Sequence, residues 1–533
     1  MLDTLIRGGW LADGTGNPLY QSDLAIEGDR IVEVARLDGA EARTVVDASG
    51  KVVCPGFVDI NGHSDYSFHT NPGFESTIRQ GVTTEIVGNC GNGFAPVSEL
   101  SRGFVSARLA EFAYEGPVEW TSYASYLEAV AALRPACNLA FMVGHNALRY
   151  AAGVGNAPLG EDHARVMESF VREAMEAGAY GMSTGLEFEP GRRAATEEII
   201  ALNKVVGEYD GVYASHTRNR DSGLLGSVAE FLTIVREGKT RGQHLHLNVR
   251  DNTGAPVDGW QRAVELLEEA RTAGLDVLTD TTPYRFGTGM MAGILPNWLF
   301  EGGVGPALER LGDESVRQRL RGDCDRYWRF IHKGQWERVR LQGSPQFPEL
   351  DGLTFDEIAA RWGKDPWDCY FDILLASGPK MESMQLIGML FTDEHLAEMI
   401  AHPLFCLSAD TFSSDIEGPL AGVLRHPIPY GGHVRFLTHH VGERRTLRLE
   451  EAIRKMTSMP ASRYGLAGRG ILRPGAAADV VVFDSKRLAE NSTLEQPLAY
   501  ATGVEWVFVN GTAAIADSHR RPERSGRILR HVG

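Results

Sequence analysis

Short runs of apolar, β-branched residues alternate with helix-like stretches through the middle of the chain. Each run is followed by a polar loop, and several loops lead into segments whose apolar positions recur every three or four residues. Eight such strand–helix units predict a (β/α)₈ TIM barrel in the α/β class. The predicted strands are 53–60, 83–87, 138–143, 180–183, 212–215, 244–247, 276–278 and 404–408, and the predicted helices include 163–177, 226–236 and 260–273.

The two ends of the chain follow a different pattern, in which short strands are separated by Gly, Asp and Asn turns. We predict that residues 1–52 and 470–533 pair into one small β-sandwich domain, and that residues 53–469 form the barrel. The seventh and eighth predicted strands are separated by many more residues than one strand–helix unit needs. We therefore predict an insertion at about 286–400 that forms a subdomain or a lid over the barrel mouth.

Composition and charge narrow the class of protein. The chain has 533 residues, of which 43% are hydrophobic and 23% charged, as in an ordinary globular protein with a large core. The formal net charge of −17 argues against non-specific binding to nucleic acid or to an anionic membrane. We expect a small-molecule substrate, with no nucleic-acid or membrane partner, and leave a homo-oligomer open.

Cysteine spacing and the N-terminus bear on the compartment. The six cysteines lie far apart and form no C-x-x-C pair, so a disulfide framework is not expected. The N-terminal residues lack the basic and apolar segments of a signal peptide, and no stretch is apolar enough to span a membrane. We therefore expect a cytoplasmic enzyme.

Residues capable of chemistry mark the ends of the predicted strands, where the active sites of such barrels form. Cys90, His216 and His246 follow the second, fifth and sixth strands and could bind one zinc ion, with water at the fourth position. His244 and His246 alternate in a predicted strand and so share a face, which leaves both as candidates. The other strand-end candidates are Asn61, His63, His145, Asp280, Tyr284 and Asp410.

Asp410 follows the eighth strand and is the candidate catalytic residue. A carboxylate beside a zinc-bound water can take its proton and deliver it to the leaving group. Each of these residues also has a structural alternative. Cys90 could be an apolar core cysteine, His216 a buried histidine with satisfied hydrogen bonds, and Asp410 a helix N-cap.

Taken together, these motifs resemble the D-aminoacylase (N-acyl-D-amino-acid deacylase) branch of the amidohydrolase superfamily. The resemblance covers nearly the whole chain. Its motifs are CPGFVD at 54–59, GNCG at 88–91, GHN at 144–146, STGLEFEPG at 183–191, SHTR at 215–218, SAD at 408–410 and RGILRPGAAAD at 469–479.

The resemblance implies a tightly bound zinc on Cys90, His216 and His246, and it favours His246 over His244. It also implies a weaker second metal, which shares the cysteine and uses two histidines after the first strand. This chain keeps His63 but has Asn61 in place of the other histidine. An amide oxygen is a poorer zinc ligand than imidazole. We therefore expect one tightly bound Zn²⁺ and a second site that is weak or absent, with His63 as either a metal ligand or a contact of the substrate or of the ligands.

The resemblance further implies a Tyr, Lys, Tyr, Arg set that holds the free carboxylate of the substrate. The matching positions here are Phe188, Asn248, Tyr284 and Ile428, so both cations and one hydroxyl are replaced. Burying a carboxylate without cationic partners is costly. Four arginines could substitute, although none falls on a matching position: Arg218, Arg220, Arg250 and Arg285.

These observations predict a zinc-dependent hydrolase of an amide-type C–N bond, whose N-acyl or amide substrate lacks the free α-carboxylate. Zinc hydroxide would attack with Asp410 as general base and acid, and His145 or Tyr284 would stabilise the oxyanion. The predicted substrate contacts are Asn61, His145, Phe188, Asn248, Tyr284 and Ile428. The alternatives are an N-acyl-D-amino-acid deacylase with a rearranged carboxylate pocket, a lactone or ester hydrolase, and an inactive amidohydrolase-fold binding protein. Retention of Cys90, His216, His246 and Asp410 argues against the inactive protein.

Overall fold

A computed structural model describes residues 1–532 except 250–253, 324–330, 332 and 345. Its centre is the predicted barrel of parallel strands, split by hydrogen bonding into two sheets. Among the described residues, none of the helices combines the length and apolar character needed to cross a membrane. The barrel strands are β6 (Phe57–Asp59), β7 (Val82–Val87), β8 (Asn138–Phe141), β9 (Val143–Gly144), β10 (Gly181–Gly185), β11 (Val212–His216), β12 (Arg241–His244), β13 (Val277–Thr281) and β17 (Phe405–Leu407).

The two barrel sheets are joined on both sides. The third strand is interrupted at Met142, between β8 and β9, but the Met142 N–H still donates to Val87 O at 2.8 Å. On the other side, Gly62 after β6 forms a parallel bridge with Thr411 after β17. The Asp59 carboxylate supports this closure by accepting from the backbone N–H of Asn61 at 3.0 Å and of Ala409 at 3.3 Å.

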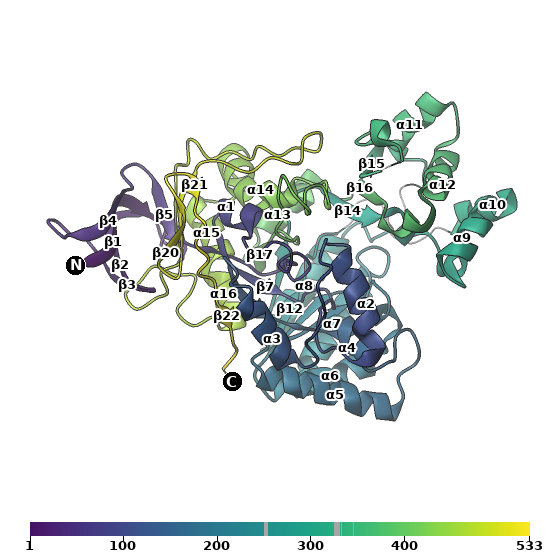
Figure 1. Ribbon diagram of the computed structural model, residues 1–533, viewed down its shortest axis with the longest axis horizontal. Helices are drawn as coiled ribbons and strands as arrows, with labels where there is room; N and C mark the ends of the chain where they lie inside the picture. The colour runs from purple at the N-terminus through teal and green to yellow at the C-terminus, as the bar shows by residue number, and fades with distance from the viewer. Residues whose placement is uncertain (250–253, 324–330, 332, 345, 533) are drawn as a thin grey trace.

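Helices cover the outside of the barrel between its strands (Figure 1). The three helices predicted from periodicity are present as α5 (Glu161–Glu176), α7 (Leu224–Gly238) and α8 (Gly259–Thr272). Their buried positions pack into the main hydrophobic core. The remaining helices around the barrel are α1 (Glu75–Arg79), α2 (Glu99–Ala110), α3 (Tyr123–Ala132), α4 (His145–Ala151), α6 (Thr196–Gly207), α13 (Asp393–Ala401), α14 (Ile428–Arg435), α15 (Leu449–Met456) and α16 (Ser458–Tyr464).

Strands from both ends of the chain share one nine-stranded sheet, which lies at one end of the molecule (Figure 1). The joining contact is β5 against β18 in antiparallel register, with Cys54 opposite Val481. The strands are β1 (Leu2–Leu11), β2 (Tyr20–Glu27), β3 (Arg30–Ala35), β4 (Ala42–Asp47), β5 (Val52–Pro55), β18 (Val480–Phe483), β19 (Val504–Val509), β20 (Thr512–Ala516) and β21 (His519–Arg520). The sandwich arrangement and the exact domain boundaries stay predictions.

Two details differ from the expected organisation. The predicted first barrel strand, 53–60, is divided at Gly56, so that β5 belongs to the terminal sheet and only β6 to the barrel. A side chain at Gly56 would come within 2.1 Å of Thr83, which shows how closely the chain passes the barrel there. At the other end, β22 (Ile528–Leu529) leaves the terminal sheet and pairs with β8 in the barrel.

The segment between β13 and β17 forms a separate body at the far end of the molecule from the terminal sheet (Figure 1). It has its own hydrophobic core, which includes Trp336, Phe355 and Tyr370. Its elements are β14 (Phe286–Met290), α9 (Val304–Leu311), α10 (Glu314–Asp323), β15 (Val339–Gln342), α11 (Phe355–Trp362), α12 (Pro366–Ser377) and β16 (Gln385–Met389).

Candidate metal centre and active site

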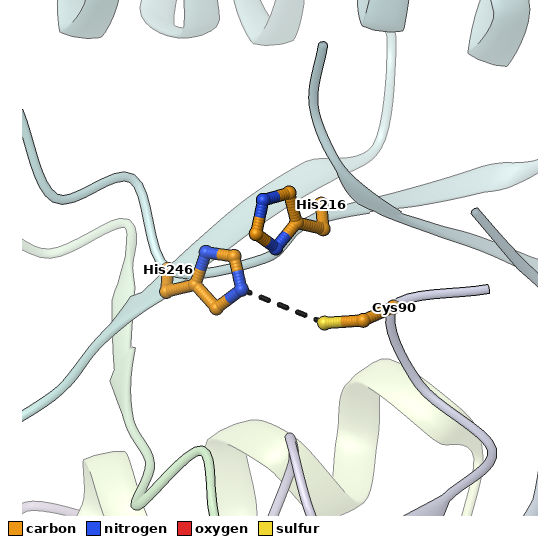
Figure 2. Close-up of side chains that lie close together, drawn as sticks. All are labelled: Cys90, His216 and His246. Carbon is orange, nitrogen blue, oxygen red and sulfur yellow. Dashed lines mark hydrogen bonds between the residues drawn. The ribbon is translucent and has the colours of Figure 1, made fainter. Parts of the chain in front are cut away.

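Three side chains of metal-ligand type converge at the C-terminal edge of the barrel. Cys90, His216 and His246 each offer a ligand atom, and these atoms lie within 4.8 Å of one another. The Cys90 Sγ is 3.6 Å from His246 Nε2, and the two imidazole rings meet at near right angles with centroids 4.5 Å apart. Figure 2 shows the three side chains pointing toward a common space from three separate segments. All three residues are buried.

The loop after β7 positions Cys90 by a tight backbone turn. Gly88, Cys90 and Gly91 all have φ between 53° and 80°. Only glycine fits at the two flanking positions, because a Cβ would lie 2.1 Å from Met142 O at Gly88 and 2.6 Å from Gly185 N at Gly91. The sequence GNCG therefore holds the thiol at the end of the strand. Burial raises the pKa of the Cys90 thiol to about 11, although His63 opposes this shift.

The structure separates the two histidines of the sixth strand. The predicted strand 244–247 is wrong, because β12 ends at His244 and His246 lies beyond it with φ 34°. The two residues therefore do not share a face. His244 packs edge-on against Phe231 of α7, whereas His246 belongs to the cluster with Cys90 and His216.

Asp410 lies beside this cluster. With 31% of its side chain accessible, it is more exposed than the three cluster residues. Its carboxylate contacts His63 Nε2 at 3.2 Å and His246 Nε2 at 3.8 Å, and it accepts from the Asn61 amide at 3.3 Å. Burial would raise the pKa of Asp410, but His246 and His63 outweigh it and hold the pKa well below its usual range. The carboxylate is therefore ionised and can accept a proton.

His63, Cys90 and Asp410 form a second group whose ligand-type atoms lie within 4.8 Å of one another. Asn61 contacts this group only through its amide nitrogen, while its buried Oδ1 has no hydrogen-bond partner. Asn61 is fully buried beside Asp410. The second group thus has one imidazole where a two-histidine site would have two.

Each of the two cluster histidines has a charged partner. The sequence did not predict Glu187 as a partner, and it suggested Arg220 only as a partner of a substrate carboxylate. Glu187 Oε2 lies 2.7 Å from His216 Nε2, and Arg220 Nη1 lies 3.0 Å from His246 Nδ1. Glu187 and Arg220 are themselves 3.6 Å apart. The position of Glu187, two residues after the end of β10, was a signal for this contact, since neighbouring parallel strands bring their C-terminal ends together.

The residue before Asp410, Ala409, belongs to a small cluster of apolar side chains. Tyr284, Ala409 and Ile428 form a small buried cluster, packed against the half-buried Phe286 and Leu424. The Tyr284 hydroxyl donates to Glu490, and Arg435 bonds the other oxygen of the same carboxylate at 2.9 Å. The single hydroxyl proton of Tyr284 is therefore already used within the protein.

The other three residues predicted to contact the substrate lie in different surroundings. The Phe188 ring lies against His216 with centroids 4.4 Å apart and is 37% exposed. Asn248 is buried and donates to Thr281 Oγ1 at 3.1 Å. His145 is fully buried, contacts Glu198 at 2.8 Å and belongs to neither ligand group, so its role as an oxyanion donor stays a prediction.

Three of the four arginines considered as carboxylate partners lie in the described part of the chain and are paired with acids of the protein. Arg218 bonds Glu230 at 2.8 Å, and Arg285 lies 3.6 Å from Asp393. Arg220 is held between His246 and Glu187. Arg250 lies outside the described residues.

The donor set of the first cluster fits zinc. One thiol and two imidazoles are ligands that this ion prefers, and a site with three protein ligands leaves a coordination position for water or substrate. The partly exposed Asp410 lies 3.8 Å from His246. The fit is therefore to a catalytic type of site and not to a closed structural one.

Comparison with known proteins agrees with this geometry. Residues 44–514 match the amidohydrolase family. The chain is 33% identical to N-acyl-D-glutamate deacylase of Alcaligenes xylosoxydans xylosoxydans, over 99% of this chain and 96% of the relative, and 32% identical to D-aminoacylase of the same organism, over 99% and 97%.

A solved structure shows the same relationship. The N-acyl-D-glutamate deacylase of Bordetella bronchiseptica, complexed with zinc and a phosphonate inhibitor, superposes with a TM-score of 0.81 at 30% identity, covering 99% of both chains. Hydantoinases, at 16% identity or less, share the barrel fold. The chain is a member of the amidohydrolase family of enzymes and is similar along its length to N-acyl-D-amino-acid deacylases.

Proposed function

We propose that this protein is a zinc-dependent hydrolase of an amide-type C–N bond in an N-acyl compound without a free α-carboxylate. The observation that carries the hydrolase assignment is the convergence of Cys90, His216 and His246 within 4.8 Å, beside the partly exposed carboxylate of Asp410. The similarity to deacylases supports the type of bond.

Cys90, His216 and His246 would hold one zinc ion. Bound there, zinc would polarise the scissile carbonyl and make water more acidic. Asp410 takes a proton from the attacking water and transfers it to the departing nitrogen, because its carboxylate is ionised and partly open to solvent. His63 and Asn61 hold this carboxylate in place through contacts of 3.2 and 3.3 Å. A second metal at His63, Cys90 and Asp410 would bind weakly, since Asn61 replaces an imidazole there.

The neutral substrate is inferred from what lies beside Asp410. Ile428, Ala409 and Tyr284 offer an apolar wall, and the Tyr284 proton is committed to Glu490. Of the arginines considered, those in the described part of the chain are all paired with carboxylates. A free carboxylate bound there would lose its hydration without gaining a charge-assisted hydrogen bond. A carboxamide, ester, anilide or cyclic imide does not carry that cost.

A second candidate is an N-acyl-D-amino-acid deacylase that holds the carboxylate in a different way, and the names of the relatives favour it. A matched substrate series separates the two. N-Acetyl-D-amino acids and their C-terminal amides or methyl esters, with the same side chains, should be assayed for kcat/KM of N-acyl cleavage. We expect the neutral compounds to be preferred. A preference for the free acids would overturn the neutral-substrate proposal, and cleavage of the ester bond alone would point to an esterase or lactonase.

A further inference from the structure

The two histidines of the proposed zinc cluster have partners of opposite charge. His216 contacts the carboxylate of Glu187 at 2.7 Å, and His246 contacts the guanidinium of Arg220 at 3.0 Å. The side chains of His216 and Glu187 are 5% and 8% accessible, so water screens their contact little. A buried charge-assisted contact of this length restrains the ring that it holds.

The contact of Glu187 decides which nitrogen of His216 is available for a metal. An ionised carboxylate only accepts hydrogen bonds, so His216 Nε2 must carry the proton that it donates. In a neutral imidazole the lone pair is then on Nδ1. Figure 2 shows one ring nitrogen of His216 turned toward Cys90 and His246. The ring is also confined from the side by Phe188, whose centroid is 4.4 Å away.

We infer that Glu187 is a positioning residue for the metal centre, which fixes the tautomer and orientation of His216 so that Nδ1 faces the shared space with Cys90 and His246. This inference rests on the proposed zinc site. A metal-binding histidine is commonly held by a carboxylate on its other nitrogen, and loss of that partner typically weakens metal binding about 10–100-fold. In this role Glu187 acts through His216.

Arg220 offers a competing explanation, because it lies 3.6 Å from Glu187 and next to His246. In this explanation Glu187 favours metal binding because it neutralises the charge of Arg220, and not because it orients His216. The two routes differ in one respect. An effect carried by His216 persists when the charge of Arg220 is removed, whereas an effect carried by charge balance disappears.

The test is the zinc dissociation constant of the full-length protein, measured by competition with a chromophoric chelator. Glu187→Ala should weaken zinc binding about 10–100-fold, and Glu187→Gln should weaken it less, because an amide oxygen can still accept from Nε2. Glu189→Gln is the matched control, since Glu189 lies on the same loop but pairs with Arg193. Its zinc affinity should equal that of the wild type. The melting temperatures of the metal-free proteins report any general loss of structure, and Glu187→Gln stands in if the alanine variant does not fold.

The outcomes separate this inference from the proposed function. Unchanged zinc affinity in Glu187→Ala, with tight binding in the wild type and weak binding in Cys90→Ser, would overturn the role of Glu187 and leave the zinc site intact. Loss of the Glu187→Ala effect in an Arg220→Gln background would replace positioning by charge balance. Failure of the wild type to bind zinc, or a Cys90→Ser variant that binds as tightly as the wild type, would overturn the proposed zinc site itself. Replacement of zinc by Co²⁺ adds a spectroscopic reading, because its absorption bands should shift in Glu187→Ala and not in Glu189→Gln.

Discussion

The two sides of the site differ in the groups that meet there. On the metal side, which comprises Cys90, His216, His246 and Asp410, polar atoms face one another at 3.6–3.8 Å or face charged partners. On the substrate side, which comprises Tyr284, Ala409 and Ile428, the contacts are apolar, and the one hydroxyl bonds Glu490.

The two sides meet at the segment after β17, which supplies both Asp410 and Ala409. The three proposed zinc ligands come from other strands, since Cys90 follows β7, His216 ends β11 and His246 follows β12. The strands that supply the metal ligands therefore need not change when the segments around the substrate change. The proposed change of substrate therefore leaves the three proposed zinc ligands in place.

Removal of the metal should break the metal side completely and produce the largest effect. Treatment with a strong chelator should abolish turnover, and about one equivalent of Zn²⁺ should restore it, since three ligands are available in the first cluster. Cys90→Ser should show the same loss without chelator. Cys369→Ala, in the core of the insertion, is the control and should keep its zinc. An active protein that contains no metal would contradict the metal-dependent mechanism.

Asp410→Asn should leave zinc bound but reduce kcat by about 10²–10⁴-fold, the usual contribution of a general acid–base group. The amide keeps the shape of the side chain but cannot take the proton from water. Metal content by elemental analysis and kcat on the best substrate of the series are the measurements. Asp415→Asn is the control, because Asp415 lies on the same segment but bonds Asn71. Wild-type turnover in Asp410→Asn would remove Asp410 from the mechanism.

The proposed preference for neutral substrates should be reversed when cations are introduced at positions 248 and 428. Ile428→Arg combined with Asn248→Lys should raise kcat/KM for free N-acetyl-D-amino acids relative to their amides by about 10–100-fold, since a hydrogen bond to a charged group contributes about 1.5–3 kcal/mol. Ile428→Leu, which keeps the wall apolar, should leave the ratio unchanged. Metal content should stay constant in both variants. If the ratio does not move in the double variant, positions 248 and 428 do not read the substrate carboxyl group.

Local sequence patterns predicted the barrel but misplaced two of its strands for physical reasons. The hydrophobic pattern predicts one strand through Gly56, because hydrophobicity continues across the point where the chain passes from the terminal sheet to the barrel. Alternating His and Leu predict the sixth strand at 244–247, whereas His246 has a left-handed backbone that hydrophobicity does not encode.

The same limit applies to the site. Side-chain type and position at strand ends were enough to bring forward Cys90, His216, His246 and Asp410, which the structure places together. The partners that orient them arise from tertiary contacts. Glu490 is more than 200 residues from Tyr284 along the chain, and only the fold brings the two together. The contact of His145 with Glu198 of α6 is likewise a tertiary contact that local sequence does not show.

Asn61→His should sharpen the boundary of the metal side with the smallest effect on turnover. It would add an imidazole next to His63 and Asp410, and we expect the zinc content to rise from about one toward two per chain while kcat changes only a few-fold. Asn61 is fully buried, so the larger ring should cost about 1–3 kcal/mol of stability through overpacking. Elemental analysis gives the metal content and thermal unfolding the stability, with Asn61→Gln as the control for side-chain size. A zinc content that stays at one would mean that position 61 does not face the second metal site.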